Sequence, residues 1–238
     1  MSPLLASPRQ RAATRRSAPP RAGYSVDVVL LTVLDGQLAA ALVRAEGRPG
    51  ERLRERWTLP WEAGAVDESL ADAAERVSRD VMGVAPHYIE QVGAFGDGRR
   101  HPGPAPLSVA FVALVPAGAA MPADTGGDFF PVNDLPALAP RQRAMIDAAV
   151  AHVQQRVGHA PIAFRLLPTT FTLSELQELY ELLLDRRLHK ASFRRSLQAA
   201  RIVEATEEWR SEGRGRPAQL FRYAPRRRRS TPRGIRFE

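Results

Sequence analysis

Apolar residues fall into short strand-like runs and helical stripes over the first two thirds of the chain. Residues 25–34 and 37–43 are apolar runs, and the Asp35-Gly36 dipeptide between them predicts a tight hairpin because both residues tolerate positive φ. A short segment at 57–60, strands at 87–95 and 107–115, and helices at 69–82 and 140–157 are expected to follow. The second helix would bury one face, made of Met145, Ala148, Ala149 and Val153. This mixed order is typical of an α+β sandwich.

After residue 160 the pattern becomes helical and then returns to strands. Thr172, with Glu175 three residues later, predicts a capping box that starts a helix. A second helix is expected over residues 190–200, with Phe193, Leu197 and Ala200 inward. Strands at 202–206 and 219–223 flank the basic segment 213–217. Two helices followed by a basic hairpin predict a winged helix-turn-helix domain.

The second of these helices carries the candidate DNA-reading residues. In a winged helix the second helix enters the major groove, where arginine and glutamine contact base edges, and the hairpin tip contacts the backbone or the minor groove. Each basic feature alone is more often solvated surface or a flexible loop, but their order together favours DNA binding. The predicted DNA-binding residues are Lys190, Arg194, Arg195, Gln198, Arg214 and Arg216.

Charge divides the chain at about residues 158–161. Residues 24–160 carry 12 basic and 17 acidic residues, whereas residues 161–223 carry 11 and 8, so attraction for nucleic acid belongs to the C-terminal part. We expect a disordered basic arm at 1–23, a sensor domain at 24–158, the winged helix at 159–224 and a basic tail at 225–238.

One segment carries the pattern of a known signature. Glu68, Arg76, Gly83 and Val84 match the Nudix box, G-x5-E-x7-R-E-U-x-E-E-x-G-U with U a bulky apolar residue, if Glu62 occupies the position of its first glycine. The chain therefore resembles the Nudix family, and the resemblance implies a Nudix-type α/β/α sandwich. Trp61 and Glu62 stand where the family has two glycines, and bulky residues there hinder close approach of a phosphate to the backbone.

The same register removes most of the catalytic acids. Val77, Asp80 and Val81 fall where a Nudix enzyme has three glutamates that hold magnesium, and a hard cation needs several oxygen ligands. Asp80 alone would hold an ion weakly, and it lies one helical turn from Arg76, with which it is as well placed to form an ordinary ion pair. We therefore expect neither catalysis nor a metal site nor a cofactor. The alternative is a Nudix hydrolase that acts on ADP-ribose or another nucleoside diphosphate derivative.

Motifs in both halves are similar to those of the Nudix-related transcriptional regulators, the NrtR-like family. They are residues 88–91, 95–96 and 108–111 of the first half, and residues 161–168, 171–177, 193–195 and 215–222 of the second. The resemblance implies a homodimeric repressor that binds double-stranded operator DNA, controls genes of NAD metabolism and releases the operator when ADP-ribose binds. It also implies base and phosphate contacts at Arg194, Arg195 and Arg216.

Candidate ligand contacts are less well defined than the DNA contacts. Arg99 and Arg100 have the charge to pair with a diphosphate, and Trp57 or Phe95 has the ring to stack on adenine, although each is as well explained by a structural role. With Glu68 and Arg76 they make up the predicted ligand-binding set. Residues 100–105 and the lost glycine pair depart from the family pattern and weaken the case for ADP-ribose as the particular ligand. His101 is isolated in the sequence and is assigned no role.

Composition excludes some classes of site. The chain of 238 residues has no cysteine, so it has no disulfide and no thiolate metal site. No apolar run reaches membrane-spanning length, and residues 1–23 have no apolar core of a secretory signal. We expect a cytoplasmic protein without a membrane partner.

Overall fold

The first part of the chain folds around one mixed sheet. The computed structural model describes residues 23–45, 56–158, 160–211 and 217–225. The strands of this sheet are β1 (Tyr24–Leu34), β2 (Gln37–Arg44), β3 (Trp57–Thr58), β4 (Trp61–Ala63), β5 (Tyr88–Phe95), β6 (Leu107–Leu114) and β7 (Asp128–Pro131). The order is β3-β2-β1-β6-β5, with β4 paired to β1 and β7 to β2. The β1–β6 pair is parallel and the other pairs are antiparallel.

The hairpin between β1 and β2 forms as predicted. Asp35 and Gly36 have φ of 49° and 73°, so both residues occupy the left-handed region that a tight hairpin requires. The pairing of Leu34 with Gln37 closes the turn. Two residues of the right type thus set the register of β1 and β2.

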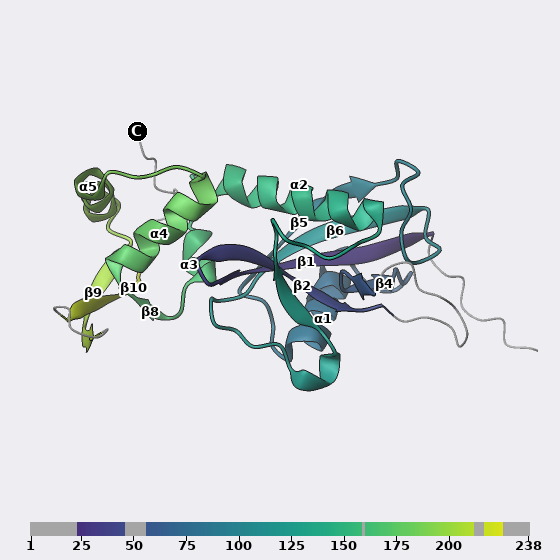
Figure 1. The fold of residues 1–238 in the computed structure, drawn as a ribbon, viewed down its shortest axis with the longest axis horizontal. Coiled ribbons are helices and arrows are strands. Elements are labelled where there is room, and N and C mark those ends of the chain that lie inside the picture. The colour runs from purple at the N-terminus through teal and green to yellow at the C-terminus, as the bar shows by residue number, and fades with distance from the viewer. Residues whose placement is uncertain (1–22, 46–55, 159, 212–216, 226–238) are drawn as a thin grey trace, which may run out of the picture.

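One helix covers each face of the sheet (Figure 1). Helix α1 (Leu70–Met82) packs on the side chains of Val26, Val28 and Leu30, whereas α2 (Pro140–Arg156) packs on those of Val29 and Leu31. Successive strand residues point to opposite faces, so the continuous apolar run of β1 serves both layers. A short 3-10 helix, η1 (Ala123–Thr125), precedes β7.

The C-terminal part is a winged helix. It contains α3 (Ala163–Leu166), β8 (Thr170–Phe171), α4 (Leu173–Leu184), α5 (Lys190–Ala200), β9 (Val203–Arg210) and β10 (Ala218–Tyr223), with its strands in the order β8-β10-β9. The predicted α+β sandwich followed by a winged helix-turn-helix is therefore confirmed. Among the described residues, no helix is long and apolar enough to cross a membrane.

The predicted capping box is present at the start of α4. Thr172 Oγ1 accepts the Glu175 N–H at 3.1 Å, and the Glu175 carboxylate accepts the Thr172 N–H at 2.6 Å. Such an N-cap contributes about 1 kcal/mol. It fixes the first residue of the helix that packs against α5.

Several local expectations were wrong. Ala200 was expected to point inward, but it is exposed at the last turn of α5, where Phe193 and Leu197 alone fill the inner stripe. The segment 57–60 supplies only the two-residue β3, and Trp61 begins a new strand, β4, that pairs with β1. Strands β7 and β8 are short and gain their structure from backbone pairing with distant strands, so no periodicity in the sequence marks them.

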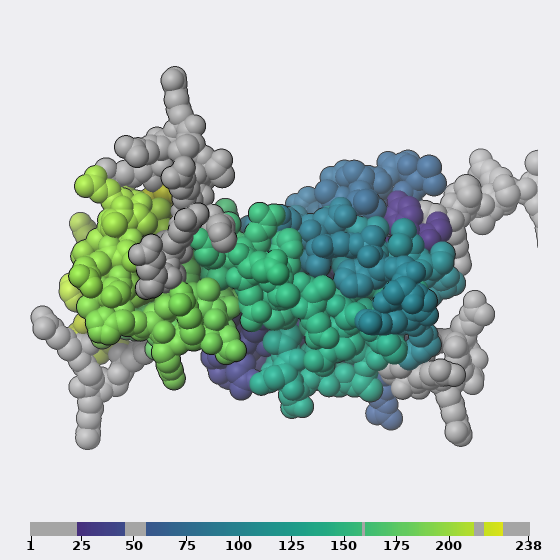
Figure 2. Space-filling model, turned by 90° about the horizontal axis from the view of Figure 1, so that it is seen from above, coloured from purple at the N-terminus to yellow at the C-terminus, as the bar shows by residue number. Residues whose placement is uncertain are grey.

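The two parts share one continuous apolar core. The cluster under α2 runs from Val29 and Met145 through Ile162 and Leu166 to Phe171 and Leu197. The Ala117 N–H donates to the Leu166 carbonyl at 2.7 Å and joins the loop after β6 to α3. Figure 2 shows the winged helix lying against the end of the sandwich. A shift of one part must therefore repack the other.

Candidate functional site

The helix of the Nudix-like segment presents one polar face outward from the sheet. Ser69 caps α1 by accepting the Asp72 N–H at 3.1 Å, as its side chain type predicts. Val77 is 3% exposed and packs into the α1 core, and Val81 packs against the same cluster. Two positions that the resemblance assigns to metal-binding glutamates therefore carry apolar side chains here, Val77 buried and Val81 partly buried.

Arg76 is the centre of the polar groups on this face. Its Nε and Nη2 donate to the two carboxylate oxygens of Glu68 at 2.9 and 2.8 Å, and its Nη1 donates to Glu62 at 2.5 Å. Asp80 lies further away, at 3.9 Å from Nη1. The hydrogen bond from Arg76 lowers the pKa of Glu68, and the bonds to Glu68 and then Glu62 raise the pKa of Arg76.

Glu62 reaches this cluster because of the short strand β4. Side chains alternate along a strand, so Trp61 points to the α2 side and Glu62 to the α1 side. A carboxylate thus occupies the position of the first glycine of the box and binds the arginine. The guanidinium neutralises carboxylates that would otherwise attract a cation, and no metal-binding group of three or more His, Asp or Glu occurs within the described ranges.

A buried polar network lies on the opposite face, beneath the start of α2. The Asp27 carboxylate is fully buried and accepts hydrogen bonds from Ser25 Oγ at 2.7 Å, Gln142 Nε2 at 3.2 Å and His101 Nε2 at 2.8 Å. Gln142 Oε1 in turn accepts the Thr58 hydroxyl at 2.9 Å. No local pattern in the sequence marks His101 as functional, because its buried partner Asp27 lies 74 positions away in the chain.

This network holds the loop between β5 and β6 in place. The Gly103 N–H donates to His101 Nδ1 at 2.9 Å, and Arg141 Nη1 donates to the Ala105 carbonyl at 2.9 Å. The Trp61 ring packs edge-on against His101, with centroids 4.9 Å apart. A Cβ on Gly103 would lie 2.3 Å from that indole, so only glycine fits this close approach. Trp61 thus fills space between the β4 strand and the loop.

The arginines expected to bind a diphosphate lie in this loop. Arg99 is about half exposed and pairs with Asp97 at 3.1 Å. The Arg100 carbonyl accepts the Arg141 N–H at 3.1 Å, which ties its backbone to the start of α2. The loop is therefore fixed at its base by buried bonds, while Arg99 is held at the surface by a weak local pair.

The aromatic residues of the predicted ligand set lie elsewhere on the sheet. Trp57 in β3 has the Arg44 guanidinium 4.1 Å from its ring centroid and packs edge-on against Phe130. Phe95 ends β5 and packs against the core under α2. Within the predicted ligand set, Glu68 and Arg76 contact each other directly, whereas Trp57, Phe95 and Arg99 contact residues outside the set.

The candidate DNA interface lies on α5, the helix farthest from the sandwich (Figure 1). Phe193 and Leu197 are each 1% exposed, and Phe193 packs edge-on against Tyr180 of α4 with centroids 5.7 Å apart. This packing leaves the opposite face of α5 outward. The four side chains predicted to reach DNA from this helix are all exposed: Lys190, Arg194, Arg195 and Gln198.

The turn before α5 and the wing are both tied to α4. Glu181 accepts the Leu188 N–H at 2.9 Å, the Gln177 amide at 2.9 Å and Arg187 at 2.9 Å, and these bonds, the Gln177 bond first, lower its pKa. Arg210 of β9 donates to Glu175 at 2.6 Å. Arg214 and Arg216, predicted at the wing tip, lie outside the described residues. Trp209 beside the tip is 58% exposed and was not singled out from the sequence.

The comparisons agree with this combination of parts. Residues 163–223 match the NrtR DNA-binding winged helix domain. The chain is 29% identical over 209 residues to an ADPR responsive transcriptional repressor NtrR of Acinetobacter baylyi, covering 84% of this chain and 81% of the relative. It superposes on Shewanella oneidensis NrtR complexed with a 27mer DNA with a TM-score of 0.75 and 30% identity, covering 91% of this chain and 100% of that one. A MutT/nudix family protein of Enterococcus faecalis (TM-score 0.62, 18% identity, 90% and 94% covered) shares the fold alone.

A Nudix-like sandwich joined to a winged helix defines a two-domain class of transcriptional regulators. Within that class, this chain belongs to the NrtR family. It is a homologue of an ADPR responsive transcriptional repressor.

Proposed function

We propose that this protein is a repressor that binds operator DNA through α5 and the wing and releases it when ADP-ribose binds the Nudix-like domain. The observation that carries the proposal is the exposed basic face of α5, set on a winged helix like that of the Shewanella protein complexed with DNA. Each basic side chain that replaces counterions at a phosphate adds affinity at low salt. Lys190, Arg194, Arg195 and Gln198, with Arg214 and Arg216, are the proposed contacts. A DNA-binding regulator works in the cytoplasm, where the chromosome lies.

The Nudix-like domain is proposed to sense and not to hydrolyse. Val77 supports this reading, because a buried valine at a metal position supplies no ligand oxygen. Arg76 and Glu68 are proposed as ligand contacts on the α1 face. Trp57 and Phe95 pack against the core under α2, so they stay separate candidate contacts, as do Arg99 and Arg100 of the β5–β6 loop. Release of DNA then follows from linkage, since a ligand that prefers the non-binding geometry lowers operator affinity by its differential binding free energy.

The protein is proposed to act as a homodimer with domain limits at 24–158 and 159–224. A dimer would present two copies of α5 to half-sites one helical turn apart. The continuous apolar core between sandwich and winged helix supports coupling of the Nudix-like domain to the DNA-binding domain, because a displaced sandwich must move α4 and α5 with it.

The test is fluorescence anisotropy on labelled DNA from upstream of the protein's own gene and its neighbours. We expect sequence-dependent binding that weakens when ADP-ribose is added, and sedimentation should give twice the chain mass. Magnesium-dependent turnover of ADP-ribose, lost in Asp80→Ala, would instead support the hydrolase alternative. Equal affinity for all DNA sequences would overturn the reading of α5.

A further inference from the structure

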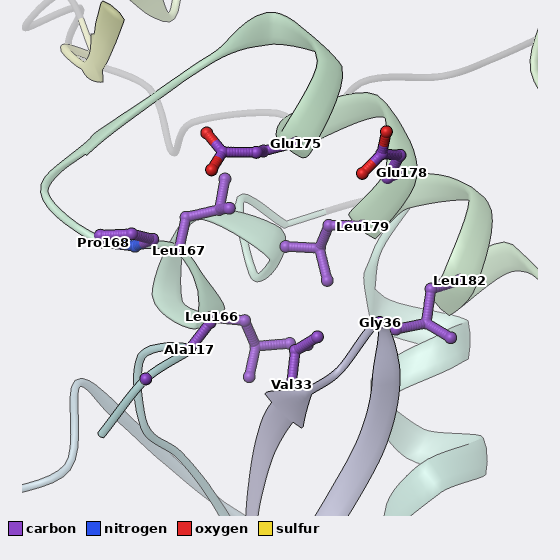
Figure 3. Close-up of a pocket in the computed structure, with 11 residues that line it drawn as sticks. Val33, Gly36, Ala117, Leu166, Leu167, Pro168, Glu175, Glu178, Leu179 and Leu182 are labelled. Atoms are coloured by element: carbon purple, nitrogen blue, oxygen red, sulfur yellow. The ribbon is translucent and has the colours of Figure 1, made fainter. Parts of the chain in front are cut away.

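A cavity of about 410 Å³ lies between the sandwich and the winged helix (Figure 3). The sandwich contributes Val33 and Gly36 at the β1–β2 turn, with Ala117 and Gly118 from the loop after β6. The winged helix contributes the end of α3 and one side of α4, including Leu166, Glu175, Glu178, Leu179 and Leu182. Sites for small molecules fall in this size range and occur preferentially at such domain boundaries.

The walls of the cavity are mainly apolar and firmly held. Leu166 and Leu179 are 0% and 5% exposed, and both are part of the core that joins the two domains. The hydrogen bond from the Ala117 N–H to the Leu166 carbonyl fixes the cavity floor to both sides. The cavity is therefore part of the domain junction and not a surface irregularity.

Among the described residues that line the cavity, the charged groups are both carboxylates. Glu175 and Glu178 lie three residues apart on α4, so they share one side of the helix. In Figure 3 both stand along the α4 wall on one side of the apolar residues. Glu175 already binds the Thr172 N–H and Arg210, whereas Glu178 is exposed. A ligand that complements this lining has an apolar body and a positively charged end.

We infer that this cavity is a second effector site, which binds a small amphipathic amine with its ammonium group at Glu178. The Nudix-like ligand site around Arg76 lies on the α1 face, whereas the cavity lies at the end of the sheet beside α3 and α4. Because its walls come from both domains, an occupant that fits one relative placement of the domains better than another shifts their equilibrium. The effect on DNA affinity rests on the proposed function, but the binding of the amine does not.

Binding is tested first on the full chain without DNA, by calorimetry. Three probes share one apolar body, a phenyl ring with four methylenes: 4-phenylbutylamine, 4-phenylbutan-1-ol and 5-phenylpentanoic acid. We expect the affinity order amine, alcohol, acid, because the carboxylates attract the ammonium group and repel the acid. Equal affinity for all three, or no binding of the amine at millimolar concentration, would overturn the site.

Two variants locate the bound amine. Glu178→Gln should lower the affinity for the amine by about fivefold, equivalent to about 1 kcal/mol, and leave the affinity for the alcohol unchanged. Glu75→Gln is the matched control, because Glu75 is a partly exposed glutamate on α1 away from the cavity, and this change should alter the affinity of neither the amine nor the alcohol. Leu182→Phe should reduce binding of amine and alcohol alike by filling the cavity, with the thermal transition used to verify folding. An unchanged amine affinity in Glu178→Gln would refute the assigned orientation.

Coupling is tested by repeating operator binding with saturating 4-phenylbutylamine. We expect operator affinity to change in the unsubstituted protein and to change less in Glu178→Gln at the same amine concentration. An amine that binds without altering operator affinity would disprove the effector role. Failure of the protein to bind any DNA would instead contradict the proposed function and leave the calorimetric result standing.

Discussion

Replacement of His101 by alanine tests whether the buried network organises the sensor domain. Asp27 is fully buried, and the imidazole supplies one of the hydrogen bonds that its carboxylate accepts. Because the Gly103 N–H donates to Nδ1, that nitrogen is the acceptor and Nε2 carries the proton that binds Asp27. His101→Ala removes this donor and the anchor of the loop together.

The expected cost is large because the buried Asp27 carboxylate loses one of its hydrogen-bond donors and the loop loses its anchor. Breaking one bond to a buried charge costs about 3 kcal/mol of unfolding free energy. For a chain of this size that corresponds to a fall of roughly 6–12 °C in Tm. His152→Ala is the control, since its bond to Glu90 is partly exposed and should contribute at most about 1 kcal/mol.

Urea denaturation of a double-mutant cycle decides whether the two residues act as a pair. Asp27→Asn in the His101→Ala background should cost less than Asp27→Asn alone, with a coupling energy of about 1–2 kcal/mol. A loss below about 0.5 kcal/mol for His101→Ala would show that the network does not stabilise the domain. Strict additivity would show that His101 acts through the loop alone and not through the Asp27 carboxylate.

Three further predictions concern DNA, catalysis and pH. Arg194→Ala should weaken operator binding by about 5- to 150-fold and relax sequence preference in anisotropy titrations, whereas the exposed Arg143→Ala should change neither. Magnesium-dependent release of phosphate-containing products from ADP-ribose should be absent in the unsubstituted chain and in Asp80→Ala. The pKa of Glu68 is lowered in the folded state, so its contribution to stability is complete above about pH 4.5 and is lost as the pH falls further. The Tm difference between the unsubstituted chain and Arg76→Ala should therefore shrink from pH 6 to pH 3 in calorimetry, and a constant difference would contradict this.

Local sequence signals predicted the elements that depend on near neighbours. The Asp35-Gly36 turn and the capping box at Thr172 each need only residues within a few positions, and both form as predicted. The spacing of Phe193 and Leu197 likewise predicted which face of α5 turns inward and hence which residues are exposed. The exposure of the candidate DNA-binding side chains on α5 could therefore be predicted from the sequence.

The polar cluster around Arg76 could be predicted only in part. The box spacing singled out Glu68 and Arg76 but suggested Asp80 as the partner of Arg76, whereas the structure pairs Arg76 closely with Glu68 and leaves Asp80 at 3.9 Å. The bond from Arg76 to Glu62 required the side-chain alternation of a strand, β4, that the sequence did not reveal. The sequence did not predict the Asp27 network for a related reason. Pairing of β1 with β4 and β6 brings together residues that are distant in the chain and show no local periodicity.

The sequence by itself determined the two kinds of domain, the valines at two box positions expected to hold glutamate, and the outward basic face of α5, since these depend on residue type and short-range spacing. Only the tertiary structure decided that Glu62 binds Arg76, that His101 is buried against Asp27 and that a cavity opens between sandwich and winged helix. Those features arise where strands and helices distant in sequence meet, and their geometry is set by packing that no single segment encodes.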